Sequence, residues 1–259
     1  MKINPAITID NLGGKGYQLQ RLSSVCDVPP FFVIKFDSYS EIKSKDIQRT
    51  IIAEFDRYKF GLVSVRSSAT VEDGALASFA GIFESVLNVD RNDLVSAIEQ
   101  VLNSIKNERV KQYCELKNID FGRIEMRVVV QKMINADASG VCFTKTPNDT
   151  DNMTIEACFG LGEALVGGKV TPDNYIVNHK TQNIEKVSVG YQRTLLNQGG
   201  WVDVPFHQKN ARKLTDDEIK ALASVCLQIE KVLNFNAADI EWAFENGKLF
   251  ILQAREVTG

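Results

Sequence analysis

Short runs of apolar and β-branched residues recur along the chain and predict β-strands. Weaker runs at 191–196 and 201–204 lie within a polar, irregular stretch, residues 178–213, whose pattern predicts no particular function. The clearest runs cover residues 28–34, 63–65, 85–89, 125–134, 137–144, 154–159 and 171–177.

Apolar residues at helical spacing predict helices at 17–22, 37–60, 90–117 and 215–233. We expect Asp90 or Asn92 to cap the third of these helices. Thr215, followed by Glu218 three residues later, predicts a capping box at the start of the fourth helix.

Length and charge narrow the class of protein. A chain of 259 residues can bury a large core, as one large domain or two lobes. The net charge of −3 argues against a general nucleic-acid partner or an anionic-membrane partner, because it lacks the basic excess that such binding uses. There is no apolar run of about 18 residues and no signal core at the start, so we expect a cytoplasmic protein.

The five cysteines are scattered and never have the Cys-x-x-Cys spacing. We therefore expect buried, reduced thiols rather than a zinc site or a disulfide framework. The two histidines, His179 and His207, have no Cys or His neighbour at ligand spacing, and we expect both on the surface.

Residues 63–89 predict a strand, a loop rich in Ser, Ala and Gly, and a return strand that begins at Ser85. Arg66 lies at the mouth of the loop, and small residues such as Gly81 let backbone N–H groups approach a phosphate. This pattern indicates a flap over an anionic ligand. The alternative is an ordinary Ser/Gly-rich hairpin loop.

Lys15 lies among three glycines, in Gly13-Gly14-Lys15-Gly16, just before the first predicted helix. A Gly-rich turn leading into a helix N-terminus is a natural anion site. The motif is weak by itself, because it lacks the spacing of a P-loop.

Residues 238–255 predict a hairpin that turns at Asn246-Gly247. We expect a three-residue loop, Glu245 to Gly247, which pairs Asp239 with Gln253 and separates the two faces. One face then carries Ile240, Trp242, Phe244, Phe250 and Leu252, and the other Asp239, Glu241, Gln253 and Arg255. Two carboxylates and an amide oxygen suit Mg²⁺, with Arg255 beside them to neutralise phosphate charge; the alternative is a solvated charged face.

These motifs resemble the nucleotide-binding domain of the phosphoenolpyruvate synthase, pyruvate phosphate dikinase and rifampicin phosphotransferase family. The resemblance rests on Arg66 to Thr70 followed by Ser78 to Gly81, on Ala138-Ser-Gly-Val-Cys-Phe-Thr144, on Gly160-x-Gly162-Glu163, and on Asp239-x-Glu241 with Gln253-x-Arg255. It implies an α+β, ATP-grasp fold of two lobes, residues 1–125 and 126–259, with the nucleotide cleft between them.

The resemblance also implies roles for individual residues. Lys15, Arg66 and Arg255 would act in catalysis. The nucleotide would contact Lys15, Arg66, Gly81, Ser85, Gln131, Met133, Glu163, Glu241, Gln253 and Arg255, with the adenine near Gln131 and Met133. Mg²⁺ would be bound by Asp239, Glu241 and Gln253.

The activity implied is a dikinase-type transfer from Mg-ATP to a histidine, with release of AMP, followed by delivery to pyruvate or another small acceptor. Neither His179 nor His207 lies in a Thr-x-His-type motif. We therefore expect the phosphohistidine on a separate domain or protein, and this chain to be a stand-alone subunit or an excised domain. The alternatives are a direct small-molecule kinase that forms ADP, and a nucleotide-binding module without turnover.

Overall fold

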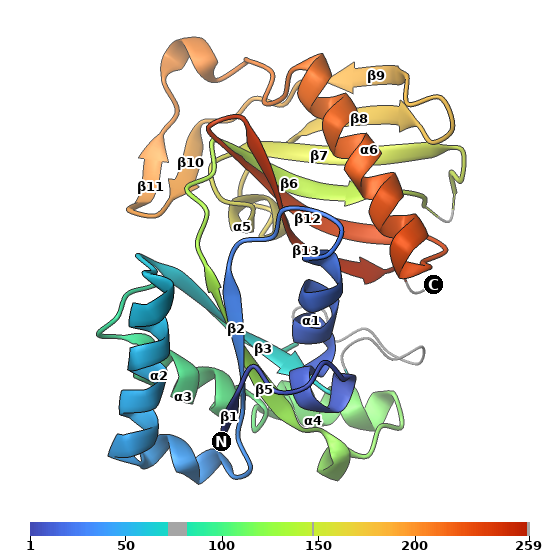
Figure 1. Cartoon of the computed structure of the whole chain (residues 1–259). Helices are drawn as coiled ribbons and strands as arrows, with labels where there is room; N and C mark the ends of the chain where they lie inside the picture. The colour runs from blue at the N-terminus through green and yellow to red at the C-terminus, as the bar shows by residue number, and fades with distance from the viewer. Residues whose placement is uncertain (72–81, 147, 258–259) are drawn as a thin grey trace. The chain divides into compact units, whose positions relative to one another are not determined.

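The computed structural model describes residues 1–71, 82–146 and 148–257 (Figure 1). These residues form two compact units: unit 1 contains Met1–Gln20 and Pro29–Met133, and unit 2 contains Arg21–Val28 and Ile134–Val257. The division after Met133 comes later than the boundary predicted after residue 125, because the intervening strand is central to the unit 1 sheet. Residues 21–28 belong to unit 2, although the sequence assigned them to the first lobe.

Unit 1 is built on a five-stranded antiparallel sheet with the strand order β1-β2-β5-β3-β4 (Figure 1). Its central strand, β5, is almost entirely buried, as expected for a near-continuous apolar run. The strands are β1 (Lys2–Ile3), β2 (Phe31–Lys35), β3 (Val63–Ala69), β4 (Ser85–Val89) and β5 (Met126–Lys132).

The helices of unit 1 are α1 (Ile9–Leu22, whose last two residues belong to unit 2), α2 (Lys45–Tyr58), α3 (Leu94–Ser104) and α4 (Glu108–Leu116), with short 3-10 turns η1 (Tyr39–Lys43) and η2 (Phe121–Arg123).

The single helix predicted over 90–117 is wrong, because it is interrupted between α3 and α4. At the break, the Asn107 N–H donates to the carbonyl of Ser104, three residues earlier, instead of four residues earlier as in an α-helix. The Asn107 backbone itself is extended. The Ser104 hydroxyl bonds to the Val101 carbonyl at 2.7 Å.

Alternation along β3 gives the unit 1 sheet two different faces. On the core face, Val63 and Val65 pack in one apolar cluster with residues of α2 and α3. The opposite face is polar on β3, and the register continues it onto β5, since Arg66 pairs with Val129. The residues on this second face are Ser64, Arg66 and Ser68 of β3 and Arg127, Val129 and Gln131 of β5.

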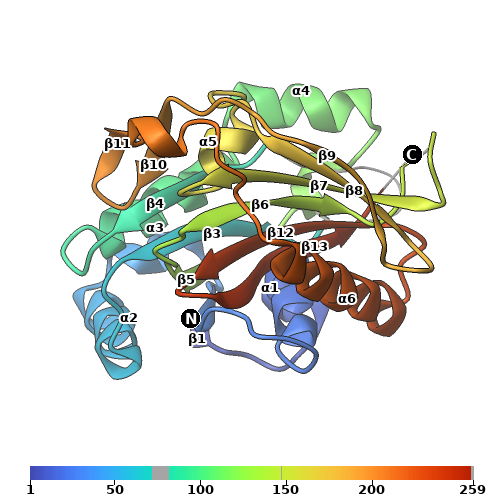
Figure 2. The ribbon, with the colours of Figure 1, turned by 90° about the horizontal axis from the view of Figure 1, so that it is seen from above.

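Unit 2 contains a six-stranded antiparallel sheet with the order β13-β12-β6-β7-β8-β9, and α6 lies along one face of it (Figure 2). Trp242 and Tyr175 are among its largest fully buried side chains. The strands are β6 (Ala138–Phe143), β7 (Asn152–Phe159), β8 (Asp173–Asn178), β9 (Ile184–Ser188), β12 (Ala238–Glu245) and β13 (Lys248–Glu256).

The other elements of unit 2 are α5 (Glu163–Val166), η3 (Phe206–Gln208), α6 (Asp216–Leu233) and a separate hairpin of β10 (Thr194–Asn197) and β11 (Gly200–Asp203). The predicted capping box is confirmed, because Thr215 and Glu218 exchange side-chain to backbone hydrogen bonds at the start of α6. Strand β9 was not predicted; four of its five residues are exposed, so it has no buried apolar stripe.

All five thiols are free, and four of them are buried as predicted, whereas Cys26 is partly exposed. Of the two histidines predicted on the surface, His207 is exposed, whereas His179 is half-buried. The His179 Nε2 lies 3.2 Å from Oε1 of the buried Glu230, which also binds Lys145 at 2.7 Å. Among residues 1–71, 82–146 and 148–257, no helix combines the length and hydrophobicity needed to cross a membrane.

Candidate functional site

The Gly-rich segment around Lys15 lies inside α1 rather than before it, which corrects the predicted helix start. Helix α1 is interrupted at Gly13, whose φ of 68° and ψ of 177° are not helical. A Cβ on Gly13 would lie 2.1 Å from the carbonyl oxygen of Ser68, so only glycine fits here. Lys15 therefore lies in the first turn of the helical segment that restarts after Gly13, where N–H groups are unpaired by the helix itself.

Ser68 attaches this turn to β3, the strand that carries Arg66. The Ser68 hydroxyl donates to the Leu12 carbonyl at 2.7 Å and accepts from the Gly16 N–H at 2.9 Å. Gly16 also packs closely on the sheet, since a Cβ there would lie 3.1 Å from Val33. The two cationic residues predicted to bind phosphate, Lys15 and Arg66, thus belong to connected elements on one face of unit 1.

Arg66 lies opposite Ser85 on β4, and its Nη1 is 3.4 Å from Oε1 of Gln131. Gln131 is only 2% exposed, and its Nε2 has no hydrogen-bond partner among the residues that the structure describes. A buried donor without a partner costs about 1–3 kcal/mol, so its presence points to a ligand that the donor binds. Three predicted residues, Arg66, Ser85 and Gln131, therefore share one face of the sheet.

Gly81 and Met133 were also predicted to contact the nucleotide. Gly81 lies outside the described residues. The Met133 N–H already donates to the Leu62 carbonyl at 2.9 Å, so it cannot bind a purine edge unless that bond breaks. The Met133 side chain is half-buried, and its packing on the ring stays a prediction.

The hairpin of β12 and β13 turns on two residues, Asn246 and Gly247, both with positive φ, so the predicted three-residue loop is wrong. The register of the two strands shifts between Glu241 and Trp242, because β13 has one extra residue there, a β-bulge. Trp242 consequently pairs with Ile251, whereas Phe250 and Leu252 were predicted on its face.

The predicted grouping of polar residues survives this change with different partners. Asp239 pairs with Arg255, not with Gln253, and Glu241 pairs with Gln253. Directly opposite residues in an antiparallel pair share a face, so all four side chains lie on one side of the hairpin. The Arg255 guanidinium binds Oδ2 of Asp239 through Nε at 2.9 Å and Nη2 at 2.5 Å.

The electrostatics of the hairpin fit a bound cation. Burial raises the pKa of the Asp239 carboxyl above its ordinary value; Arg255 opposes that rise and the charge of Glu241 adds to it. Two carboxylates with an amide oxygen opposite form a hard donor set of the kind that Mg²⁺ takes. In the described part of the chain no group of three His, Cys, Asp or Glu side chains forms a metal site, so the candidate set depends on the Gln253 amide.

The register also reveals a residue that the sequence analysis missed. Glu241 pairs with Val141 of β6, and Val141 pairs with Glu156 of β7, so Glu156 faces the same side of the sheet as Glu241. Only the strand pairing shows this. The alternation of polar Thr154 and Glu156 with buried Ile155 was the one available signal.

Glu163 is the first residue of α5 and is exposed, directly after the Gly160–Gly162 turn that follows β7. It belongs to unit 2, as do Asp239, Glu241, Gln253 and Arg255. Lys15, Arg66, Ser85, Gln131 and Met133 belong to unit 1. The candidate residues thus form two groups, one in each unit.

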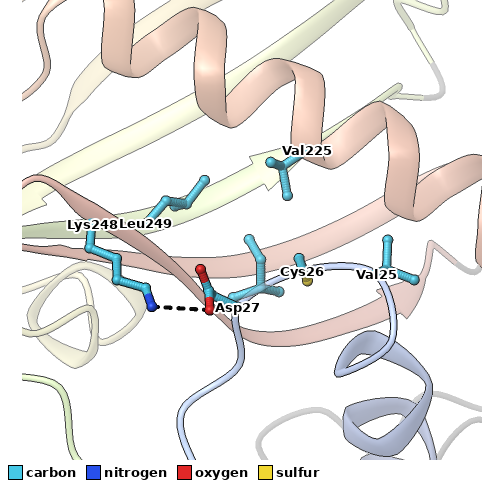
Figure 3. Close-up of a pocket in the computed structure, with 7 residues that line it drawn as sticks. Val25, Cys26, Asp27, Val225, Lys248 and Leu249 are labelled. Carbon is cyan, nitrogen blue, oxygen red and sulfur yellow. Dashed lines mark ion pairs between the residues drawn. The ribbon is translucent and has the colours of Figure 1, made fainter.

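A cavity of about 240 Å³ in unit 2 is not the predicted site (Figure 3). Its charged edge is the ion pair of Lys248 with Asp27 at 3.1 Å, drawn as a dashed line in Figure 3. Burial, together with the neighbouring Asp27 charge, raises the pKa of the Cys26 thiol to about 11, which makes it a poor nucleophile. The cavity is lined by Val25, Cys26, Asp27, Val225, Lys248, Leu249 and Ile251.

Residues 44–259 match the family described as pyruvate phosphate dikinase, AMP/ATP-binding domain. A probable phosphoenolpyruvate synthase of Methanocaldococcus jannaschii is 40% identical over 204 residues, which cover 76% of this chain and 17% of that protein. A rifampicin phosphotransferase of Streptomyces sp is 35% identical over 202 residues, 75% of this chain and 23% of that protein. The chain thus spans less than a quarter of the length of either relative.

Among solved structures, PH1788 from Pyrococcus horikoshii Ot3 is 13% identical with a TM-score of 0.46, covering 95% of this chain and 90% of that one. The family match, together with the helices and the two large antiparallel sheets, bears out the predicted α+β, ATP-grasp fold class.

Proposed function

Because the chain belongs to the pyruvate phosphate dikinase, AMP/ATP-binding domain family, we propose that it binds Mg-ATP and takes part in a dikinase-type phosphotransfer. The observation that carries the proposal is the β12–β13 hairpin, where Asp239 lies opposite Arg255 and Glu241 opposite Gln253 on one face. This places two anions, a cation and an amide together, as binding of a metal–phosphate complex requires.

The group in unit 1 supplies the phosphate contacts. Lys15 in the first turn after Gly13 and the guanidinium of Arg66 bind phosphate oxygens, and the positive end of the dipole of the restarting helix adds to their attraction for the phosphates. The buried Nε2 of Gln131 donates to the nucleotide, which supplies the acceptor that this atom otherwise lacks. These are ground-state contacts that position the triphosphate.

The group in unit 2 supplies the metal contacts. Asp239, Glu241 and Gln253 would hold Mg²⁺, which would supply positive charge to neutralise the phosphates. Arg255, which binds Asp239 through Nη2, would contact the phosphate beside the ion. Glu163, an acceptor only, binds hydrogen-bond donors of the nucleotide.

In the transfer itself, a histidine on another domain or protein attacks the β-phosphate of ATP, takes the pyrophosphoryl group and releases AMP. The outer phosphate of that group then leaves to water or inorganic phosphate, and the remaining phosphoryl group passes from the histidine to a small, pyruvate-like acceptor. Support for this step comes from relatives named phosphoenolpyruvate synthase and rifampicin phosphotransferase, of which this chain covers only the nucleotide-binding part. Neither histidine of the chain serves as the acceptor in this proposal; His179 is occupied with Glu230.

Calorimetric titration with ATP, with and without Mg²⁺, tests the binding step. Glu241→Gln should remove most of the magnesium-dependent gain in affinity, and Lys15→Ala should weaken binding by about tenfold or more, the usual effect of losing a charged hydrogen bond. Glu185→Gln, at an exposed position of β9, is the matched control and should bind as the parent does. Equal magnesium effects in Glu241→Gln and the parent would rule out the hairpin as the metal site.

Product analysis tests the transfer step. Incubation with Mg-ATP and a histidine-bearing domain of a longer relative should yield AMP and a phosphorylated histidine. ADP formed with a small acceptor alone would instead indicate a direct kinase, and tight ATP binding without any product a module without turnover.

A further inference from the structure

Gln192 contacts the main chain at the end of β7 in the manner of a neighbouring strand. Its side chain is fully buried: Oε1 accepts from the Phe159 N–H at 2.8 Å, and Nε2 donates to the Phe159 carbonyl at 3.0 Å. Strand β8 pairs with β7 only as far as Asp173 opposite Ala157. Beyond that point the Gln192 amide satisfies the donor and the acceptor that the sheet leaves open.

The turn that follows Phe159 is fixed by further contacts and leads directly to Glu163. Leu161 donates its N–H to the Leu196 carbonyl at 2.7 Å, and the Ser139 hydroxyl donates to the Gly160 carbonyl at 2.5 Å. Gly160 has a φ of 81°, and a Cβ there would lie 2.3 Å from the Leu196 oxygen. The turn therefore has little freedom while Gln192 and Leu196 stay in place.

The segment that carries Gln192 is itself anchored to β8 by a fully buried ion pair, Asp173 with Lys213, at 2.8 Å. The other oxygen contacts of Asp173 fix both ends of the segment, because Oδ1 accepts from the Gly190 N–H and Oδ2 from the Lys213 N–H, at 2.8 and 2.9 Å. Gln192 bonds back to the same segment, through its own N–H to the Lys209 carbonyl and through Nε2 to the Thr194 carbonyl.

We propose that Gln192 is a positioning residue for Glu163: it joins the anchored segment 190–213 to the end of β7 and so fixes where α5 begins. This inference rests on the proposed role of Glu163 in nucleotide binding. A primary amide is needed because the site requires a donor and an acceptor at once, which an apolar side chain or an ionised carboxylate cannot provide.

A double-mutant cycle tests the proposal in the full chain, with the Kd for Mg-ATP as readout. Glu163→Gln and Gln192→Met should each weaken binding, the latter about five- to tenfold, as expected when a hydrogen-bonded support is lost. The double variant should bind no more weakly than Glu163→Gln alone, because both changes remove the same contact. Val177→Ala, a change at a buried position of β8, controls for lost stability. Any increase in Kd that it causes should multiply with the increase caused by Glu163→Gln.

Two further measurements keep the test decisive if Gln192→Met folds poorly. Gln192→Glu keeps an acceptor for the Phe159 N–H but loses the donor, so it should also weaken binding. Hydrogen exchange of the peptide 158–163 should accelerate in both Gln192 variants and remain unchanged in Val177→Ala.

The inference would be overturned if Gln192→Met or Gln192→Glu bound Mg-ATP as tightly as the parent does. It would also be overturned if the losses of affinity in the two single variants multiplied in the double variant. Either result would leave the proposed function intact. Unchanged affinity in Glu163→Gln would remove the role of Glu163 and this inference with it. Mg-ATP binding through Lys15 and Glu241 would then still be tested by their own variants.

Discussion

Glu241 lies directly opposite Gln253, although the hairpin that joins them turns on only two residues. A regular two-residue hairpin would place Leu252 opposite Glu241 and turn Gln253 to the other face. The register shift beyond Trp242 absorbs Leu252 as the extra residue and restores the polar face. The bulge is thus what allows a tight turn and a shared metal face to coexist.

Deletion of Leu252 should therefore keep Mg-ATP binding within about threefold of the parent, because a regular ladder then pairs the same residues. Deletion of Ala254 should weaken Mg-ATP binding by about tenfold or more, since it keeps Glu241 opposite Gln253 but moves Arg255, the proposed phosphate contact, opposite Ile240 and onto the buried face. Calorimetry on both variants measures this. Equal losses in the two deletions would show that the pairing is not what matters.

Gly13→Ala should destabilise the protein by about 3–5 kcal/mol, because the new methyl group meets the Ser68 backbone and φ is positive. It should also lower ATP affinity by displacing Lys15. Gly61→Ala is the matched control in the same unit, since a Cβ there meets nothing within 4 Å. Chemical denaturation compares the two, and similar midpoints would contradict the close approach of Gly13 to β3.

Gln131→Met should lower ATP affinity about tenfold without loss of stability, because it removes a buried donor that has no partner in the described structure. Gln48→Met offers the opposite case: its Nε2 donates to the Ile42 carbonyl at 2.9 Å. That variant should melt at a lower temperature and bind ATP as the parent does. A large fall in melting temperature for Gln131→Met would mean that its amide is satisfied without nucleotide.

Glu230 should make the protein sensitive to acid. Burial alone would raise the pKa of its carboxyl, but hydrogen bonds from Lys145 and Thr144 and the charges of Lys145 and His179 outweigh burial, so the pKa lies below its ordinary value of 4.5. The native carboxyl then binds its proton less readily than the unfolded one. Its contribution to stability is present above that ordinary value and is lost as pH falls through the lowered native pKa.

The stability of Glu230→Gln should consequently depend less on pH than that of the parent between roughly pH 5 and 3. Thermal unfolding followed by circular dichroism across this range provides the measurement. Parallel curves for the two proteins would show that Glu230 does not contribute to acid unfolding.

The sequence predicted those features that depend on local chemistry. Strands such as β3 and β5, the Thr215–Glu218 capping box and the common face of Asp239, Glu241, Gln253 and Arg255 follow from alternation and capping rules. Even the wrong loop length preserved that face, because the hydrophobic pattern constrains it more strongly than the turn does.

The remaining features depend on contacts between distant parts of the chain. The break at Gly13 brings it against Ser68, and the bulge at Leu252 leaves Trp242 paired with Ile251. Gln192 lies in a polar stretch whose pattern is uninformative, and only its bonds to Phe159 reveal what it does. No local propensity encodes such pairings.

The placement of residues 21–28 in unit 2 has a consequence for how this domain can be inherited. The Asp27 carbonyl accepts from the Ile251 N–H at 2.9 Å, so a piece of the first 30 residues completes the edge of a sheet formed by the last 120 or so. A gene breakpoint near residue 134 would leave the C-terminal product without residues 21–28 of its own unit, and the N-terminal product with a segment that belongs to the other. Recombination should therefore exchange this domain between proteins as a whole, never half by half.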